Sequence, residues 1–152
     1  MGKPGELLEP ALAYQYPTRW GSLVTPDDML AKAARAVASA RALLDLGDAD
    51  GAANRAYYAM FDAARAALLA SGRIVETESI RTHSGLITAF SLHLVKPGKI
   101  PVELGRSINK AEDIRLAADY KDTPVEQDAA TWAVNEAERF VRFIKDALRT
   151  QA

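Results

Sequence analysis

The chain has 152 residues, of which 26% are charged and 49% hydrophobic, and its formal net charge is −1. This length suits one domain with a continuous core, and the near-neutral charge excludes the global basic field that drives non-specific binding to nucleic acid. The absence of cysteine excludes a disulfide framework, a cysteine nucleophile and a thiolate metal site. Without a secretory leader or a run of about 20 apolar residues, we expect a cytoplasmic protein that makes no use of a membrane.

The first segment, residues 1–25, has neither a helical nor an alternating apolar period, and it contains Tyr14, Tyr16 and Trp20. We interpret it as an N-terminal arm whose aromatic side chains pack either on its own domain or on a partner. The remaining residues, 26–152, then form a single helical domain.

The first helix is predicted over residues 26–46. Thr25 is a typical capping residue, Pro26 suits the first helical position, and the acids that follow suit the helix dipole. Gly47 is a typical end. Because only a few residues connect this helix to the next, we expect an antiparallel pair.

Residues 48–72 predict the central helix of the domain, since alanine and leucine dominate them, Asp48 can cap their start and Gly72 can end them. Two stripes recur at helical spacing. The apolar stripe comprises Ala53, Tyr57, Met60, Phe61, Ala64 and Leu68. The polar stripe comprises Asn54, Arg55, Tyr58, Asp62 and Arg65. The polar stripe is either a solvated face with an exposed ion pair or one wall of a cleft.

Three more helices follow. The third begins near residues 77–79 and carries His83 on its apolar side, the fourth spans about 102–120, and the fifth begins at a capping box over residues 123–126 with Pro124 at the first helical position. We therefore predict an all-α, up-and-down bundle of about five helices, the fifth packed alongside the first four.

Familiar catalytic signatures are absent: the chain has no phosphate-cradling glycine loop, no glycine-flanked serine elbow and no paired-histidine metal motif. Inward carboxylates are too few for a bridged metal centre. We expect neither a metal nor a cofactor. His83 is either a hydrogen-bonded core residue or a catalyst.

Three segments carry a family resemblance. RAYYAMF at 55–61, THSG at 82–85 and RLAADY at 115–120, in that order and on helices, resemble the HEPN domain, and most closely the small stand-alone prokaryotic HEPN proteins of the toxin–antitoxin type. The resemblance covers about residues 26–148. It implies an all-helical domain that forms a homodimer and is often encoded beside a minimal nucleotidyltransferase.

The resemblance also implies a chemistry. In active HEPN ribonucleases an arginine, followed about four to six residues later by a histidine, lines the dimer cleft and cuts RNA without a metal. Arg115 matches the arginine, whereas Tyr120 occupies the histidine position. A phenol is a poor general base at neutral pH. We therefore take Arg115, Tyr120 and His83 as candidate catalytic residues, with His83 as the substitute imidazole.

Arg55, Tyr58 and Asp62 on the central helix, with Asp119 on the fourth, are candidate RNA- or nucleotide-binding residues. The alternative is a buried polar network that fixes helix register. Three functions stay open: a HEPN protein that binds RNA or nucleotide in a dimer cleft and cuts RNA without a metal; a non-catalytic HEPN partner that regulates a minimal nucleotidyltransferase; and a structural helical dimer. A homodimer is also favoured because Trp132 and Phe143 widen the apolar face of the last helix.

Overall fold

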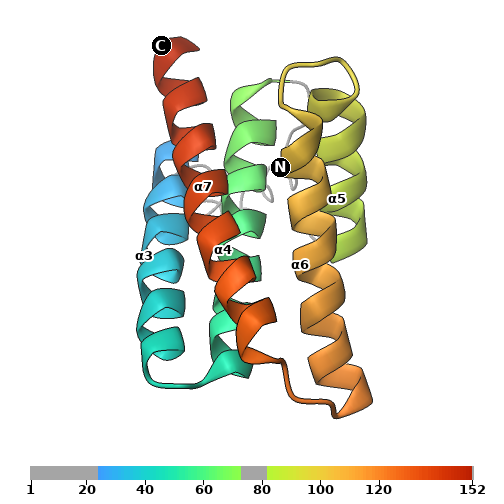
Figure 1. The fold of residues 1–152 in the computed structure, drawn as a ribbon. Helices are drawn as coiled ribbons and strands as arrows, with labels where there is room; N and C mark the ends of the chain where they lie inside the picture. Colours follow the sequence, from blue (N-terminus) through green and yellow to red (C-terminus); the bar gives the residue numbers. More distant parts are fainter. Residues whose placement is uncertain (1–23, 73–81, 152) are drawn as a thin grey trace, which may run out of the picture.

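A computed structural model describes residues 24–72 and 82–151 of the chain. Every regular element in these two ranges is helical, which confirms the all-α prediction (Figure 1). In chain order the elements are α3 (Pro26–Asp45), α4 (Ala49–Ala70), α5 (His83–Phe90), its π-helical continuation η2 (Ser91–Val95), α6 (Val102–Lys121) and α7 (Gln127–Gln151). Residues 1–23 of the expected arm and residues 77–79, where the third helix was expected to begin, lie outside the described residues.

The start of α3 confirms the predicted cap. The Thr25 hydroxyl accepts a hydrogen bond from the Asp28 N–H at 3.1 Å, and the Asp28 carboxylate accepts one from the Thr25 N–H at 3.1 Å. Asp48 caps α4 by accepting from the Gly51 N–H at 2.9 Å. Between the two helices Gly47 has a φ of +84°, a conformation that favours glycine. These local interactions produce the expected antiparallel pair.

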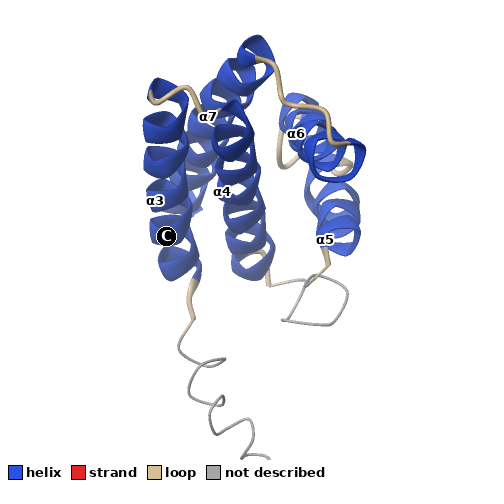
Figure 2. Cartoon of the chain, turned by 90° about the horizontal axis from the view of Figure 1, so that it is seen from below, coloured by secondary structure: helices blue, strands red, loops and turns tan. Residues whose placement is uncertain are grey.

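Helix α4 is the central element, because it contacts α3, α5, α6 and α7. Figure 2 shows α3 and α7 beside it on one side, and α5 and α6 on the other. Its small side chains allow this close packing: eight alanines of α4 are buried among its thirteen buried residues. No described helix is both long and apolar enough to span a bilayer.

Helix α3 is fastened to α7 by Arg41. Its Nε and Nη2 donate to the two carboxylate oxygens of Glu138 at 3.1 and 2.7 Å, and Nη2 also donates to the side-chain oxygen of Asn135 at 2.9 Å. This forked, charge-assisted contact raises the pKa of Arg41. It fixes the register of the first helix against the last.

The predicted start of the last helix was wrong. Residues 123–126 are not helical, and α7 begins at Gln127, with the Ala130 N–H donating to the Glu126 carbonyl. The Val125 N–H instead donates to the Asp50 carboxylate in the first turn of α4 at 2.7 Å. Because a side chain of another helix accepts this N–H, the connection is anchored to α4 and the helix starts later, at Gln127.

Candidate functional site

A polar and aromatic cluster lies where α4, α5 and α6 meet. Tyr57 and Tyr58 come from the middle of α4, His83 is the first residue of α5, and Arg115 comes from α6. The position of His83 follows from a local cap, because the Thr82 hydroxyl accepts from the Gly85 N–H at 3.0 Å and so begins the helix at residue 83. We call these four residues the Arg115 cluster.

Arg115 is nearly buried, with 8% of its surface exposed. Its guanidinium carbon lies 5.0 Å from the ring centre of Tyr57 and 5.8 Å from that of Tyr58, within the range of cation–π attraction. Its Nη1 donates to the Asp119 carboxylate at 2.9 Å, and 46% of the Asp119 side chain is exposed. Its Nε is buried and has no hydrogen-bond partner among the described residues. The positive charge of Arg115 is thus stabilised by two aromatic rings and one half-exposed carboxylate.

His83 connects the two tyrosines. The Tyr57 hydroxyl lies 2.9 Å from Nδ1, and the Tyr58 hydroxyl lies 3.4 Å from Nε2. Burial lowers the pKa of His83 and the positive charge of Arg115 lowers it further, while Glu112 opposes the change. The imidazole is therefore neutral at neutral pH and sits beside a permanent positive charge.

Tyr57 is the member of the cluster that sequence reasoning missed as a functional residue. It was assigned to the apolar stripe, and it is indeed fully buried, but its hydroxyl bonds to His83 and its ring lies beneath Arg115. Burial raises the pKa of its phenol, so the hydroxyl stays protonated. A usable signal was present, because a buried tyrosine hydroxyl usually has a hydrogen-bond partner and the sequence places His83 on the apolar side of the next helix.

Two other predicted residues of α4 lie at or beyond the edge of the cluster. The guanidinium of Arg55 is 5.8 Å from the ring centre of Tyr58. Asp62, expected in the same cleft, is 5% exposed. Burial raises the pKa of the Asp62 carboxyl, and the cations that oppose this rise are Lys32, Arg65 and Arg55. The structure therefore brings Arg55 to the edge of the cluster beside Tyr58, whereas the cations that act on Asp62 are Lys32, Arg65 and Arg55 and do not include Arg115.

Tyr120 is not brought into the Arg115 cluster. It is 80% exposed, and five residues of α-helix turn its side chain about 140° away from that of Arg115 around α6. The arginine and the residue five positions later therefore lie on different faces of one helix.

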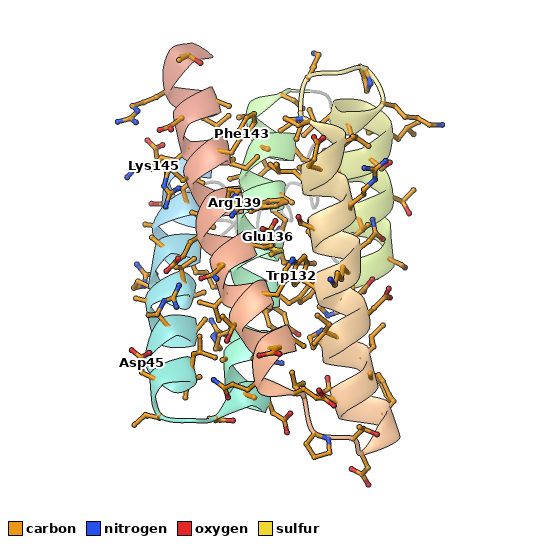
Figure 3. The ribbon with its side chains drawn as sticks, viewed as in Figure 1. Asp45, Trp132, Glu136, Arg139, Phe143 and Lys145 are labelled. Carbon is orange, nitrogen blue, oxygen red and sulfur yellow. The ribbon has the colours of Figure 1, made fainter. Side chains whose placement is uncertain are left out.

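A second feature is the face of α7 that turns toward α6. Trp132, Glu136, Arg139 and Phe143 follow one another along it (Figure 3). The two aromatic residues are half-buried. Lys110 of α6 places its ammonium 4.2 Å from the Trp132 ring centre, and the Ser107 hydroxyl donates to Glu136 at 2.7 Å. We call this the α7 stripe.

The chemistry of the Arg115 cluster suits an anion. A guanidinium, an imidazole and two phenols converge there, and no carboxylate other than the half-exposed Asp119 is bonded to Arg115 among the described residues. The charge of Glu112 acts on His83 and Tyr57. Within the described ranges no group of three histidine, aspartate or glutamate side chains has the arrangement of a metal site.

The HEPN domain family model matches residues 27–147 of the chain. A UPF0332 protein of Gloeobacter violaceus is 33% identical over 129 residues, which cover 82% of this chain and 98% of that protein. Two proteins of Methanocaldococcus jannaschii, both named as candidate toxins, are also similar. One is 41% identical over 96 residues, covering 62% of this chain and 67% of its own length, and the other is 28% identical over 125 residues, covering 80% of each chain.

Proposed function

The chain belongs to the HEPN domain family, and from this premise we propose that it binds RNA or a nucleotide by its phosphate in a dimer cleft containing Arg115. The observation that carries the proposal is the state of Arg115: its guanidinium is almost buried, yet its one hydrogen bond among the described residues goes to a half-exposed carboxylate and its Nε has no partner there. Leaving a buried donor unpaired costs about 1–3 kcal/mol. An anionic ligand would relieve that cost.

A phosphate oxygen would replace the Asp119 carboxylate at the guanidinium, since both are anions that accept from the same fork of N–H donors. Tyr58 and His83 stand beside it and would supply further hydrogen bonds. Arg55, whose guanidinium lies 5.8 Å from the Tyr58 ring centre, would contact the next phosphate or a base. Tyr120 and Asp62 remain candidates taken from the sequence, whereas Asp119, predicted as a ligand contact, is in this proposal the carboxylate that the ligand displaces.

The activity to test is metal-independent cleavage of RNA, as expected for a toxin of a toxin–antitoxin pair. The purified chain is incubated with a mixed RNA pool in the presence of a chelator, and the parent is compared with Arg115→Ala, His83→Ala and the control Arg106→Ala, which removes an exposed arginine from the same helix. We expect cutting by the parent and by the control, and loss of cutting in Arg115→Ala. A folded parent that neither cuts nor binds RNA contradicts the proposal.

The proposed homodimer would use the α7 stripe and a second copy of the chain. Trp132 and Phe143 are half-buried apolar side chains on one helix face, and between them Glu136 and Arg139 form an ion pair that would exchange partners with its counterpart across a two-fold axis. Light scattering at micromolar concentration should report a dimer for the parent and a monomer for Phe143→Ser. A monomeric parent would refute the dimer.

A second function is supported by Tyr120, which occupies the histidine position of the ribonuclease motif and is 80% exposed. In this alternative the chain is a non-catalytic partner that binds and regulates a minimal nucleotidyltransferase. A stable complex with a nucleotidyltransferase encoded beside it, without RNA cleavage, would favour this function. Failure to bind either partner would leave a structural dimer. Cytoplasmic location stays a prediction from the sequence.

A further inference from the structure

The hydroxyl of Tyr57 has one hydrogen-bond acceptor within reach among the described residues. The side chain is fully buried, and burial keeps its phenol protonated. Among the described residues, the acceptor within hydrogen-bond distance is Nδ1 of His83 at 2.9 Å. A buried hydroxyl that failed to donate would forfeit about 1–3 kcal/mol, so the Tyr57 O–H donates to Nδ1. That nitrogen must then carry a lone pair and no proton.

A neutral imidazole carries one proton, on either Nδ1 or Nε2, and the surroundings of His83 decide which nitrogen holds it. Burial and Arg115 lower its pKa, and its place at the first position of α5 adds the positive end of a helix dipole, which also disfavours the imidazolium. The other groups around the ring are Tyr57, Tyr58 and Phe61 from α4, and Glu112 from α6, which acts in the opposite direction. A neutral ring whose Nδ1 is an acceptor carries its proton on Nε2.

Nε2 is the ring nitrogen that the Tyr57 hydroxyl does not contact. It lies 3.4 Å from the Tyr58 hydroxyl, a longer separation than that of a strong bond. The guanidinium of Arg115 lies over the rings of both tyrosines that hold the imidazole. The weakly used donor Nε2 and the Arg115 guanidinium, whose Nε has no partner among the described residues, thus share the same two tyrosines, and the charge of Arg115 acts on the imidazole.

We propose that Tyr57 is a positioning residue that holds His83 as the neutral Nε2–H tautomer, so that His83 presents a hydrogen-bond donor beside Arg115 and does not serve as the general base. The identity of the ligand rests on the proposed function, but the tautomer does not. Two donors would then bind one anion: the guanidinium would attract it by charge, and the imidazole N–H would orient it through a directional hydrogen bond. Another residue of the proposed dimer would have to remove the proton from the attacking group.

The tautomer is measured directly on the unliganded chain. Only two histidines are present, so a sample labelled with 15N-histidine gives two imidazoles, and His93→Gln assigns them. At pH 7.5 we expect the unprotonated, pyridine-type 15N shift at Nδ1 of His83 and the protonated, pyrrole-type shift at Nε2. In Tyr57→Phe, which keeps the ring and removes the hydroxyl, we expect the two shifts to move toward each other as both tautomers become populated. Tyr58→Phe, the matched control, should keep the parental pattern.

The same variants separate this inference from the proposed function. A labelled single-stranded RNA should bind Tyr57→Phe about fivefold more weakly than the parent, the factor for one lost hydrogen bond, and the loss should be partial because Arg115 is still present. A proton on Nδ1 in the parent, or an unchanged pattern in Tyr57→Phe, overturns the inference even if RNA is bound and cut. If Tyr57→Phe fails to fold, the parental spectrum alone decides. If the parent binds no RNA, the proposed function fails while the tautomer is still decided.

Discussion

Replacing Arg115 by methionine should remove ligand binding without unfolding the bundle. Methionine is unbranched, has a comparable length and fills irregular apolar space. If Arg115 is held for a ligand, then its removal takes away an interaction that the folded protein alone does not need. If Arg115 instead fastens α6 to α4, its removal should destabilise the fold strongly.

The magnitude follows from the surroundings of the guanidinium. The bond to Asp119 contributes at most about 1 kcal/mol, since that carboxylate is half exposed and is rehydrated when the arginine leaves. Contact with the rings of Tyr57 and Tyr58 contributes about 1 kcal/mol for each ring. The buried Nε without a partner among the described residues costs about 1–3 kcal/mol in the folded state. These contributions nearly cancel, so we expect the free energy of unfolding to change by no more than about 1 kcal/mol.

Urea unfolding followed by circular dichroism measures the stability, and fluorescence anisotropy with a labelled single-stranded RNA measures binding. We expect Arg115→Met to bind RNA at least about tenfold more weakly, the loss of one charge-assisted contact. Arg106→Met, which also removes one positive charge from α6, should retain most of the affinity. A loss of about 3 kcal/mol or more, the effect of breaking a buried pair, together with unchanged RNA binding, would refute the reasoning.

Three further predictions concern stability. Arg41→Met should lower the free energy of unfolding by about 1 kcal/mol, because Glu138 loses a forked partner that is itself partly exposed. The midpoint of urea unfolding measures this loss, and an unchanged midpoint would show that Arg41 does not stabilise the packing of α3 on α7. The pKa of His83 is lower in the folded than in the unfolded state. Its contribution to the free energy of unfolding is therefore full above about pH 6.5 and is lost as the pH falls toward the folded-state pKa. Urea unfolding at a series of pH values should show this loss in the parent and a flatter profile in His83→Gln. Tyr120→Phe should change the free energy of unfolding by less than about 0.5 kcal/mol because the side chain is exposed, so any loss of RNA cleavage in this variant would report a role in the cleft and not unfolding.

Local signals in the sequence predicted most of the described helices. Thr25 and Asp48 lie at helix starts where their side chains can accept backbone hydrogen bonds, and both do so. The same reasoning was wrong at residues 123–126. There the Val125 N–H bonds to Asp50, which lies far away in the chain. Here a tertiary acceptor competes with the predicted cap for a backbone N–H, and neighbouring residues alone do not reveal it.

The sequence by itself determined the fold class, the central place of residues 48–72 and the family, because apolar periodicity, caps and short motifs act over a few neighbouring residues. It also singled out Arg115, His83 and Tyr58. Only the tertiary structure decided which side chains meet. Tyr57 looked like a core residue, but α5 places His83 Nδ1 2.9 Å from its hydroxyl, so the hydroxyl can position the imidazole. Asp62 and Tyr120 looked like neighbours of Arg115, but Asp62 is buried in α4 among Lys32, Arg65 and Arg55, and Tyr120 is exposed on α6.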